Sequence, residues 1–277
     1  MSTFQRTKTW VRDFVRRNGR GIAWSPEWMN LGNLLYLGLW ASRSDNRLVL
    51  AHARHEPALS LFPHLRERLF ISPSETRFTD QRLMPWTAAS RLTHGAFDSP
   101  DGVEDFVREM ILVGTPLLNQ EINLDDTLVV NVRRGDYYSV PKNQAEFGMD
   151  QASYIHLAAT MSVETLGTPS RIVVISDDIP WCRANLDRTL QAFAKVEYLD
   201  GPLTHDLRTL IHAPRLVIPN STFSYWGAYI GDTINPERQV IAPWLFSRHR
   251  NGGAADQLLP HWKVIEDLPG GWEATGP

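Results

Sequence analysis

The amino-acid sequence predicts an α/β fold built on a parallel sheet. In the second half of the chain, short apolar segments rich in valine and isoleucine alternate with segments of helical pattern. Strands that alternate with helices of about ten to fifteen residues are typical of parallel, doubly wound sheets. The length of 277 residues and the 43% hydrophobic content suit one large domain or two modest domains with real cores.

The expected elements of the second half follow one another in a regular order. The apolar segments predict strands at residues 127–133, 171–176, 195–199 and 215–219, and a further strand at 238–242. The segments between them predict helices at 150–165, 179–193, 203–213 and 222–231. Asp150 is suited to cap the first of these helices, and Pro180 suits the first turn of the second.

The first half of the chain carries weaker signals. A helix is expected to start within residues 32–37 and a strand at 48–52, and residues 101–118 have a helical pattern. Several prolines and mixed signals leave residues 54–100 without an assignment. The domain boundary is expected at 120–126, between an N-terminal domain of residues 1–126 and a C-terminal domain of residues 127–277.

Composition and charge exclude several classes of protein. The net charge of −3 gives no global field that would attract nucleic acid. Cys182 is the only cysteine, so neither a disulfide framework nor a cysteine-based zinc site can form, and we expect a buried small hydrophobe there. No apolar run reaches the roughly 18 residues of a transmembrane helix, and the N-terminus lacks an apolar stretch of the secretory type. These features indicate a cytoplasmic protein.

The first 20 residues are basic and allow two interpretations. Lysines and arginines outnumber the one acidic residue, Asp13, and apolar residues recur close to helical spacing. The segment could form an amphipathic helix on anionic lipid, which would give the protein a peripheral membrane contact. More often such a segment is a solvated helix docked on its own domain.

The first motif with chemical content is NVRRGDY at residues 131–137, directly after an apolar strand. Arginine carries a planar fork of donors suited to phosphate oxygens, so Arg133 and Arg134 point to an anionic ligand. Gly135 lets the backbone turn sharply or approach a ligand closely, and Asp136 could hold one guanidinium or act on a proton. The alternative is a strand end with two solvated arginines. Strand alternation makes the two side chains diverge, so one could bind phosphate while the other braces the loop.

Two further motifs follow apolar strands in the same way. One is VVISDDIPWC at residues 173–182, and the other is NSTFSYWGA at 220–228. Ligands of doubly wound sheets bind outside the carboxyl ends of the strands, which is where all three motifs are expected. Backbone N–H groups at the start of the third motif's helix could bind an anion, or Ser221 or Thr222 could simply cap the helix. In the second motif, Asp178 is expected to cap the following helix, although two adjacent aspartates could also suggest a metal-binding pair.

Taken in order, the three motifs resemble those of the α-1,2-fucosyltransferases of glycosyltransferase family 11, over residues 127–231. The resemblance implies a GT-B-like fold, with two Rossmann-like halves around a cleft and the acceptor bound by the N-terminal half. It also implies an inverting, metal-independent transfer of L-fucose from GDP-β-L-fucose to a glycan hydroxyl, α-1,2 to galactose, without a cofactor. Two alternatives stay open: a GT-B transferase with another sugar or linkage, and a non-catalytic protein that binds nucleotide sugars or glycans.

The resemblance also assigns roles to residues of this chain. Arg133 and Arg134 would bind the donor pyrophosphate, together with the small hydroxyl residues and the aromatic residue of the third motif. Asp206 would read guanine, or would only place favourable charge near a helix N-terminus. The donor-binding residues implied in this way are Asn131, Arg133, Arg134, Asp206, Ser221, Thr222, Phe223 and Ser224.

The chain departs from the family at two places. Asn131 stands where the family has histidine, and asparagine can only form hydrogen bonds, whereas histidine could ionise. Gly32 and Asn33 are the remnant of an N-terminal glycine-rich motif whose other glycines and glutamine are missing. The general base stays open, with Asp136 and Glu146 the carboxylates nearest the first motif.

Overall fold

The computed structural model describes residue 16 and residues 19–84, 100–119 and 122–273, and it divides into two compact units, Met1–Pro116 and Leu117–Pro277. The division comes earlier than the expected boundary at 120–126. Leu117 and Leu124 are buried, and the Arg208 side chain donates from Nε to the Leu117 carbonyl oxygen at 3.1 Å. Leu117 is therefore tied to the second unit. The assignment of the two units to acceptor and donor stays a prediction.

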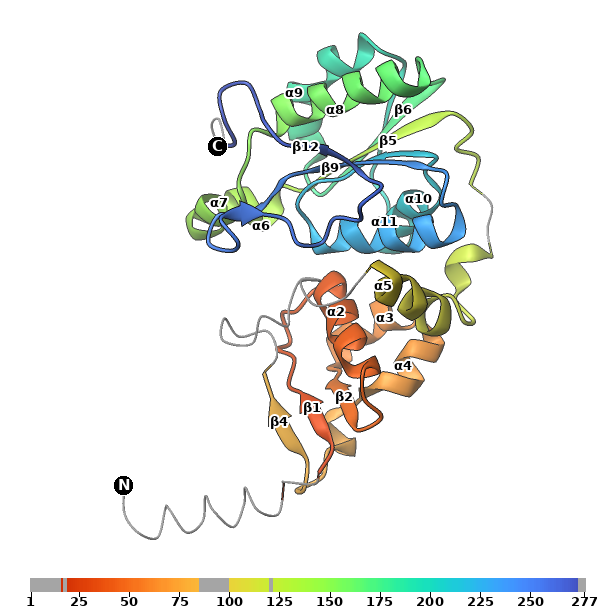
Figure 1. Ribbon diagram of the computed structural model, residues 1–277, viewed down its shortest axis with the longest axis vertical. Coiled ribbons are helices and arrows are strands. Elements are labelled where there is room, and N and C mark those ends of the chain that lie inside the picture. The colour runs from red at the N-terminus through yellow and green to blue at the C-terminus, as the bar shows by residue number, and fades with distance from the viewer. Residues whose placement is uncertain (1–15, 17–18, 85–99, 120–121, 274–277) are drawn as a thin grey trace. The chain divides into compact units, whose positions relative to one another are not determined.

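The second unit is built on a parallel sheet, as expected (Figure 1). Its strand order is β12-β9-β8-β5-β6-β7. These strands are β5 (Thr127–Val132), β6 (Arg171–Ser176), β7 (Val196–Leu199), β8 (Arg215–Val217), β9 (Gln239–Pro243) and β12 (Lys263–Ile265). A separate antiparallel pair consists of β10 (Leu245–Ser247) and β11 (Gly253–Ala254).

Helices cover both faces of this sheet. Figure 1 shows α8 and α9 on one face and α10 and α11 on the other. The helices are α6 (Gly135–Ser139), α7 (Pro141–Phe147), α8 (Gln151–Leu166), α9 (Ile179–Gln191), α10 (Leu203–His212) and α11 (Thr222–Ile234). Asp150 caps α8 by accepting the Ser153 N–H at 3.1 Å, and Pro180 lies in the first turn of α9, as predicted. Cys182 is buried, also as predicted.

Tight packing holds the layers together. Valine and isoleucine on β5 and β6 form a buried core with α8 and α9. On the other face, α10 and α11 approach so closely at Gly227 that an added Cβ would lie 2.6 Å from the Leu210 Cβ. Burial of this apolar surface is the main stabilising contribution to such a fold.

The chain reverses its direction of travel across the sheet at β5. From β5 it proceeds to β6 and β7, and then returns to β8 on the other side of β5. The carboxyl ends of β5 and β8 therefore flank the topological switch point, where ligands of open α/β sheets bind. This position follows from the strand order and places the first and third motifs at adjacent strand ends.

The first unit carries a second parallel sheet, with the order β3-β2-β1-β4. Its strands are β1 (Gly21–Ala23), β2 (Arg47–Leu50), β3 (Phe70–Ile71) and β4 (Gln81–Leu83), and its helices are α2 (Leu31–Ser42), α3 (Glu56–Leu59), α4 (Pro63–Leu69) and α5 (Pro100–Phe106). The helix near residue 32 and the strand near 48 were expected. Two parallel sheets with covering helices agree with the expected α/β, GT-B-like class.

Several expectations need correction. The single helix expected over 101–118 is divided into α5, a π-helical turn at Val107–Ile111 and a 3₁₀ turn at Pro116–Leu118. The turn sequence after the arginine motif forms two short helices, α6 and α7, which the sequence pattern did not predict. The basic segment at residues 1–20 lies almost wholly outside the described residues. In the part of the chain that is described, no helix is long and apolar enough to cross a membrane.

Candidate functional site

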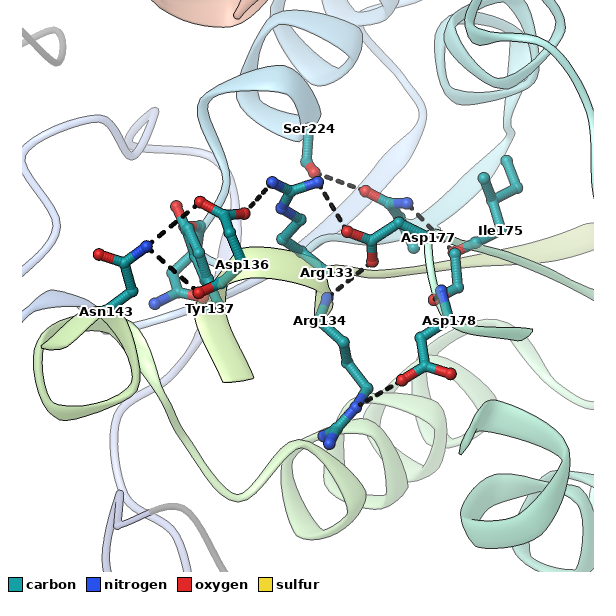
Figure 2. A network of polar contacts seen from close by, with 12 residues as sticks. Arg133, Arg134, Asp136, Tyr137, Asn143, Ile175, Asp177, Asp178 and Ser224 are labelled. Carbon is teal, nitrogen blue, oxygen red and sulfur yellow. Dashed lines mark hydrogen bonds and ion pairs between the residues drawn. The ribbon is translucent and has the colours of Figure 1, made fainter. Parts of the chain in front are cut away.

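The Arg133 side chain lies beyond the end of β5 between two carboxylates (Figure 2). Its Nη1 donates to the Asp177 Oδ2 at 2.6 Å, and its Nη2 pairs with the Asp136 Oδ1. The guanidinium also lies 5.5 Å from the centre of the Tyr137 ring. The side chain is 29% exposed, so a ligand can still reach it. Arg133 is thus a partly exposed cation in a fixed position.

The Arg134 side chain points the other way, as expected, although both arginines lie past Val132, the last residue of β5 (Figure 2). Its guanidinium lies 3.9 Å from the ring centres of both Tyr138 and Trp181, and its Nε pairs with the Asp178 Oδ2 at 3.3 Å. The side chain is 6% exposed. These contacts pack Arg134 between α6 and α9, and its side chain is far less accessible to solvent than that of Arg133.

Asp177 contacts both arginines of the first motif. The sequence analysis did not include it among the site residues. Its Oδ2 accepts from Arg133, and its Oδ1 accepts the Arg134 backbone N–H at 2.8 Å. An added Cβ on Gly135 would lie 2.4 Å from the Asp177 Oδ2. Gly135 has no positive φ, so the close approach of Asp177 is the reason that glycine fits there. The adjacent aspartates after β6 were the available signal.

Asp178 caps α9, as expected. Its Oδ1 accepts the Trp181 N–H at 3.1 Å, which satisfies one of the free donors at the helix start. Its other oxygen pairs with Arg134. In the described ranges, with their gaps, no group of three or more potential metal ligands is present.

Asn131 is a buried connector between three elements. Its Nδ2 donates to the Ile175 carbonyl oxygen on β6 at 3.2 Å, and its Oδ1 accepts the Ser224 hydroxyl from α11. Asn131 is 6% exposed and Ser224 is 1% exposed. Both polar groups of the amide are therefore engaged inside the protein. Such a position suits the ordering of the loop and of α11.

The third motif begins at a helix start whose N-cap side chain forms no cap hydrogen bond. Ser221 is the N-cap residue of α11, but its hydroxyl accepts no N–H from the first turn. Ser221 is buried, and Thr222 and Phe223 are half-buried. Asn220 anchors the loop by donating to the carbonyl oxygens of Phe147 at 2.9 Å and Phe246 at 3.0 Å. The helix start thus keeps the partial positive charge that favours an anion.

Asp206 lies in the first turn of α10 and is not stabilised there as an anion. Burial, with the charge of Asp200, raises the pKa of Asp206 to about 6. A helix N-terminus acts in the opposite direction, because it favours the charged form. The Oδ1 of Asp206 is buried without a hydrogen-bond partner, and the His205 Nδ1 lies 4.0 Å from it. A buried acceptor without a donor is costly, and a ligand that brings N–H donors would satisfy it.

The remaining predicted residues are placed as follows. Asp136 is engaged at both oxygens, by Arg133 and by the Asn143 Nδ2 at 3.3 Å. Glu146 on α7 accepts the Ser247 hydroxyl from β10 at 2.9 Å. Gly32 and Asn33 lie in the first turn of α2 in the first unit. Their role in the site, and the identity of the base, stay predictions.

Comparison with known families gives a match over most of the second unit. A profile of "Glycosyl transferase family 11" matches residues 92–266 of this chain, which contain all three motifs.

Curated proteins give matches that include related transferases. An α-1,2-colitosyltransferase of Escherichia coli is 27% identical over 155 residues, which are 54% of this chain and 51% of that protein. A galactoside α-(1,2)-fucosyltransferase 2 of Rattus norvegicus is 30% identical over 140 residues, which are 49% of this chain and 38% of that protein. The chain thus covers about half or less of the length of these relatives.

A solved structure is similar in fold. The iron-containing heptosyltransferase TibC, solved with ADP-D-β-D-heptose, aligns with a TM-score of 0.50 and 13% identity over 92% of this chain and 64% of that chain. At this identity the likeness concerns the fold alone, which agrees with the parallel sheets described above.

Proposed function

The chain belongs to glycosyl transferase family 11, and on this premise we propose that it transfers L-fucose from GDP-β-L-fucose to a glycan hydroxyl, forming an α-1,2 link to galactose. The names of the relatives support this class of reaction. The observation that carries the proposal is that the partly exposed Arg133 and the start of α11 follow the adjacent parallel strands β5 and β8.

This arrangement suits a leaving nucleoside diphosphate. In an inverting displacement, the acceptor oxygen forms a bond to the anomeric carbon while the bond from that carbon to the phosphate oxygen breaks. GDP leaves with the electron pair, and the acceptor hydroxyl loses its proton to a base. The developing charge lies on the diphosphate, where a preoriented guanidinium and helix N–H groups stabilise it. The donor needs no metal in this proposal, because Arg133 supplies the cation.

Asp136 and Asp177 contribute by orientation. They hold the Arg133 fork from two sides, and Asp177 also fixes the loop backbone at Arg134. A cation held in place does not have to reorganise when the charge on the leaving group develops. In this proposal Arg133 contacts the diphosphate, and Arg134 holds the loop in position.

Asp206 supports a guanine nucleotide as the donor. The N1–H and the exocyclic amine of guanine are two adjacent donors, and an ionised carboxylate can accept both. The buried Oδ1 of Asp206, which has no hydrogen bond in the protein, would gain one in this way. Hydrogen bonds to a charged group contribute about 1.5–3 kcal/mol, which would separate guanine from adenine nucleotides.

A second candidate keeps the site and changes the sugar. The E. coli relative is named for transfer of colitose, so the donor sugar here could be colitose on the same nucleotide. The residues that bind the nucleotide would be unchanged, because the difference lies in the sugar alone.

The test is incubation with GDP-fucose, or with the colitosyl donor, and a panel of glycan acceptors, followed by mass spectrometry. We expect the mass of an acceptor that ends in galactose to rise by one fucosyl unit. Hydrolysis of the donor without acceptor is measured in parallel. A protein that binds GDP but neither hydrolyses nor transfers from either donor would be a binding protein, and the proposal of a transferase would be wrong.

A further inference from the structure

We propose that a turn of the first unit, Pro26–Met29, is a binding site for one pyranose ring of the acceptor, with Trp28 as the ring's stacking surface. This proposal rests on the transferase function proposed above and assigns residues to its acceptor. Trp28 is 64% exposed, although tryptophan is usually well buried. Glu27 beside it has a side chain that is 77% exposed. An exposed indole next to a carboxylate combines an apolar face with a strong hydrogen-bond acceptor.

The turn lies at the ligand-binding edge of its sheet. It follows the carboxyl end of β1, and His52 follows the carboxyl end of the neighbouring parallel strand β2. Ligands of parallel sheets bind outside the carboxyl ends of the strands. Met84 follows the carboxyl end of β4 at the same edge and is 57% exposed. Apolar side chains thus remain exposed at the edge where a ligand is expected.

Hydrogen bonds hold the backbone that carries Trp28. The Met29 N–H donates to the Pro26 carbonyl oxygen at 3.1 Å and closes the turn. The His55 Nδ1 accepts the His52 N–H at 3.2 Å, so its Nε2 carries the proton and donates to the Glu27 carbonyl oxygen at 3.1 Å. Burial lowers the pKa of His55, which agrees with a neutral ring in this role. A surface residue without function would not require such anchoring, whereas a preorganised ligand surface benefits from it.

A second set of contacts fixes the start of the loop. The Ser25 hydroxyl donates to the Leu50 carbonyl oxygen, and the His52 Nε2 lies 2.8 Å from the Ser25 carbonyl oxygen. The other ring nitrogen of His52 lies 3.5 Å from the Glu27 Oε1. The Ser25 carbonyl oxygen can only accept, so Nε2 carries the proton, and Nδ1 would pair with the Glu27 carboxylate only in a protonated ring. Glu27 directly precedes Trp28 in the turn, so its exposed carboxylate stands one residue from the indole. This places a polar acceptor beside the stacking surface, where sugar hydroxyls would lie.

The size of the apolar surface favours a sugar over a protein partner. At this edge, the large apolar side chains that the described part of the unit exposes are Trp28 and Met84, and the neighbours Glu27 and Asn30 are polar and exposed. A standard protein interface buries roughly 800 Å² on each partner, far more than two side chains offer. Ligand sites combine a few aromatic side chains with a few placed polar groups, and one indole matches one pyranose ring.

Phe78 provides a matched control in the same unit. It is 71% exposed, but it precedes the amino end of β4 and so lies at the opposite edge of the parallel sheet from Trp28. Replacement of either residue removes an exposed aromatic ring. Only the loss of Trp28 should affect the acceptor.

The experiment compares wild type with Trp28→Ala, Trp28→Phe and Phe78→Ala, with lactose as the acceptor probe. We expect Trp28→Ala to raise the KM for lactose about tenfold or more, and Trp28→Phe to recover most of this loss. GDP affinity, donor hydrolysis and Tm should stay at the wild-type value in all variants. Phe78→Ala should leave the KM for lactose unchanged.

Three results would overturn the proposal while leaving the donor site intact. They are an unchanged KM in Trp28→Ala, an equal rise in Phe78→Ala, and a wild-type protein that hydrolyses GDP-fucose but neither binds nor modifies lactose. A fall in Tm or in GDP affinity in Trp28→Ala would also overturn it, since Trp28 would then support the protein rather than the acceptor. If the wild type neither binds GDP nor hydrolyses the donor, the proposed function itself fails.

Discussion

Arg133 and Arg134 are neighbours in the sequence, but their surroundings differ in burial and in their partners. Arg133 is partly exposed between Asp136 and Asp177, whereas Arg134 is packed between two aromatic rings. Stacking of guanidinium on aromatic rings contributes more when the group is removed from water. The same residue type thus serves two purposes, and each predicts a different effect of substitution.

Lysine at each position should separate these purposes. Arg133→Lys keeps the charge and loses the fork, so kcat/KM for the donor should fall about tenfold or more, about 1.4 kcal/mol, at an unchanged Tm. Arg134→Lys should instead lower Tm, because lysine cannot stack between Tyr138 and Trp181. Steady-state kinetics and thermal unfolding of both variants provide the measurement. If Arg133→Lys has wild-type kinetics, Arg133 does not bind the diphosphate.

Asp206 predicts a pH dependence of stability. Since burial raises its pKa to about 6, the folded state favours the protonated acid, and this contribution to stability is lost as the pH rises through about 6. Asp206→Asn removes the buried charge. The variant should therefore be more stable than wild type at pH 7.5, by at most about 3 kcal/mol, and equally stable near pH 4. Urea unfolding at the two pH values tests this, and a variant that is less stable at pH 7.5 would contradict it.

Asp206 also predicts a pH dependence of nucleotide binding. If the ionised carboxylate reads guanine, GDP affinity should fall by up to about tenfold per pH unit below pH 6 in wild type but not in Asp206→Asn. ADP is the control, because its phosphates titrate like those of GDP while its base lacks the two guanine donors. Calorimetric titrations at pH 5 and pH 7.5 give the comparison. Parallel losses for GDP and ADP would remove Asp206 from base recognition.

At the scale of elements, the site depends on contacts between strand ends. The end of β6 supplies Asp177 and Asp178, which hold the two arginines that follow β5. Asn131 on β5 orders Ser224 on α11, and Asn220 is anchored to α7 and β10. Each motif is therefore positioned by residues from another motif. Substitution of two glycines tests whether the contacts at the strand ends affect activity while the packing of the helices affects stability.

Gly135→Ala should lower activity, whereas Gly227→Ala should lower stability. The new Cβ at position 135 would displace the Asp177 carboxylate, so kcat/KM should fall about tenfold or more with little change in Tm. The new Cβ at position 227 would overpack against Leu210 between α10 and α11, which should destabilise the fold by about 1–3 kcal/mol. Kinetics and unfolding are measured on both. Wild-type activity in Gly135→Ala would show that the Asp177 contact is dispensable.

At the scale of the whole molecule, the strand order of the second unit determines where a nucleotide can bind. β5 lies between β6 and β8 and pairs in parallel with both, so the carboxyl ends of all three strands lie at one edge. The family match at residues 92–266 covers this edge. Binding there should stabilise the folded unit as a whole, since the contacts join loops from several strands.

GDP should therefore raise Tm without added metal. At a GDP concentration about 100-fold above its Kd, the gain in the free energy of unfolding should be about 2.7 kcal/mol. The shift should persist with EDTA present, because Arg133 supplies the cation in the proposed site. Thermal unfolding with GDP, with GDP and EDTA, and with GDP and Mg²⁺ gives the comparison. A shift that appears only with Mg²⁺ would contradict the metal-independent proposal.

The sequence by itself determined the strand–helix alternation of the second half and the helix caps at Asp150 and Asp178. These features depend on local periodicity and on backbone donors within one turn, which a single segment specifies. The sequence also predicted that Arg133 and Arg134 diverge, but both follow the last strand residue, Val132, so their contacts with Asp177 and Asp178 set the two directions. The position of the three motifs at strand ends was predicted as well, because each motif follows an apolar segment that itself specifies a strand.

The tertiary structure alone decided which arginine is exposed and which is packed, because burial depends on Tyr138 and Trp181 from separate elements. It decided that Gly135 is required by the approach of Asp177, a residue 42 positions further along the chain (177 − 135). It revealed that one buried oxygen of Asp206 has no hydrogen bond, and it revealed the anchored turn that carries Trp28. Each of these depends on contacts between segments distant in sequence, and no local pattern records which distant segment will pack against a given residue.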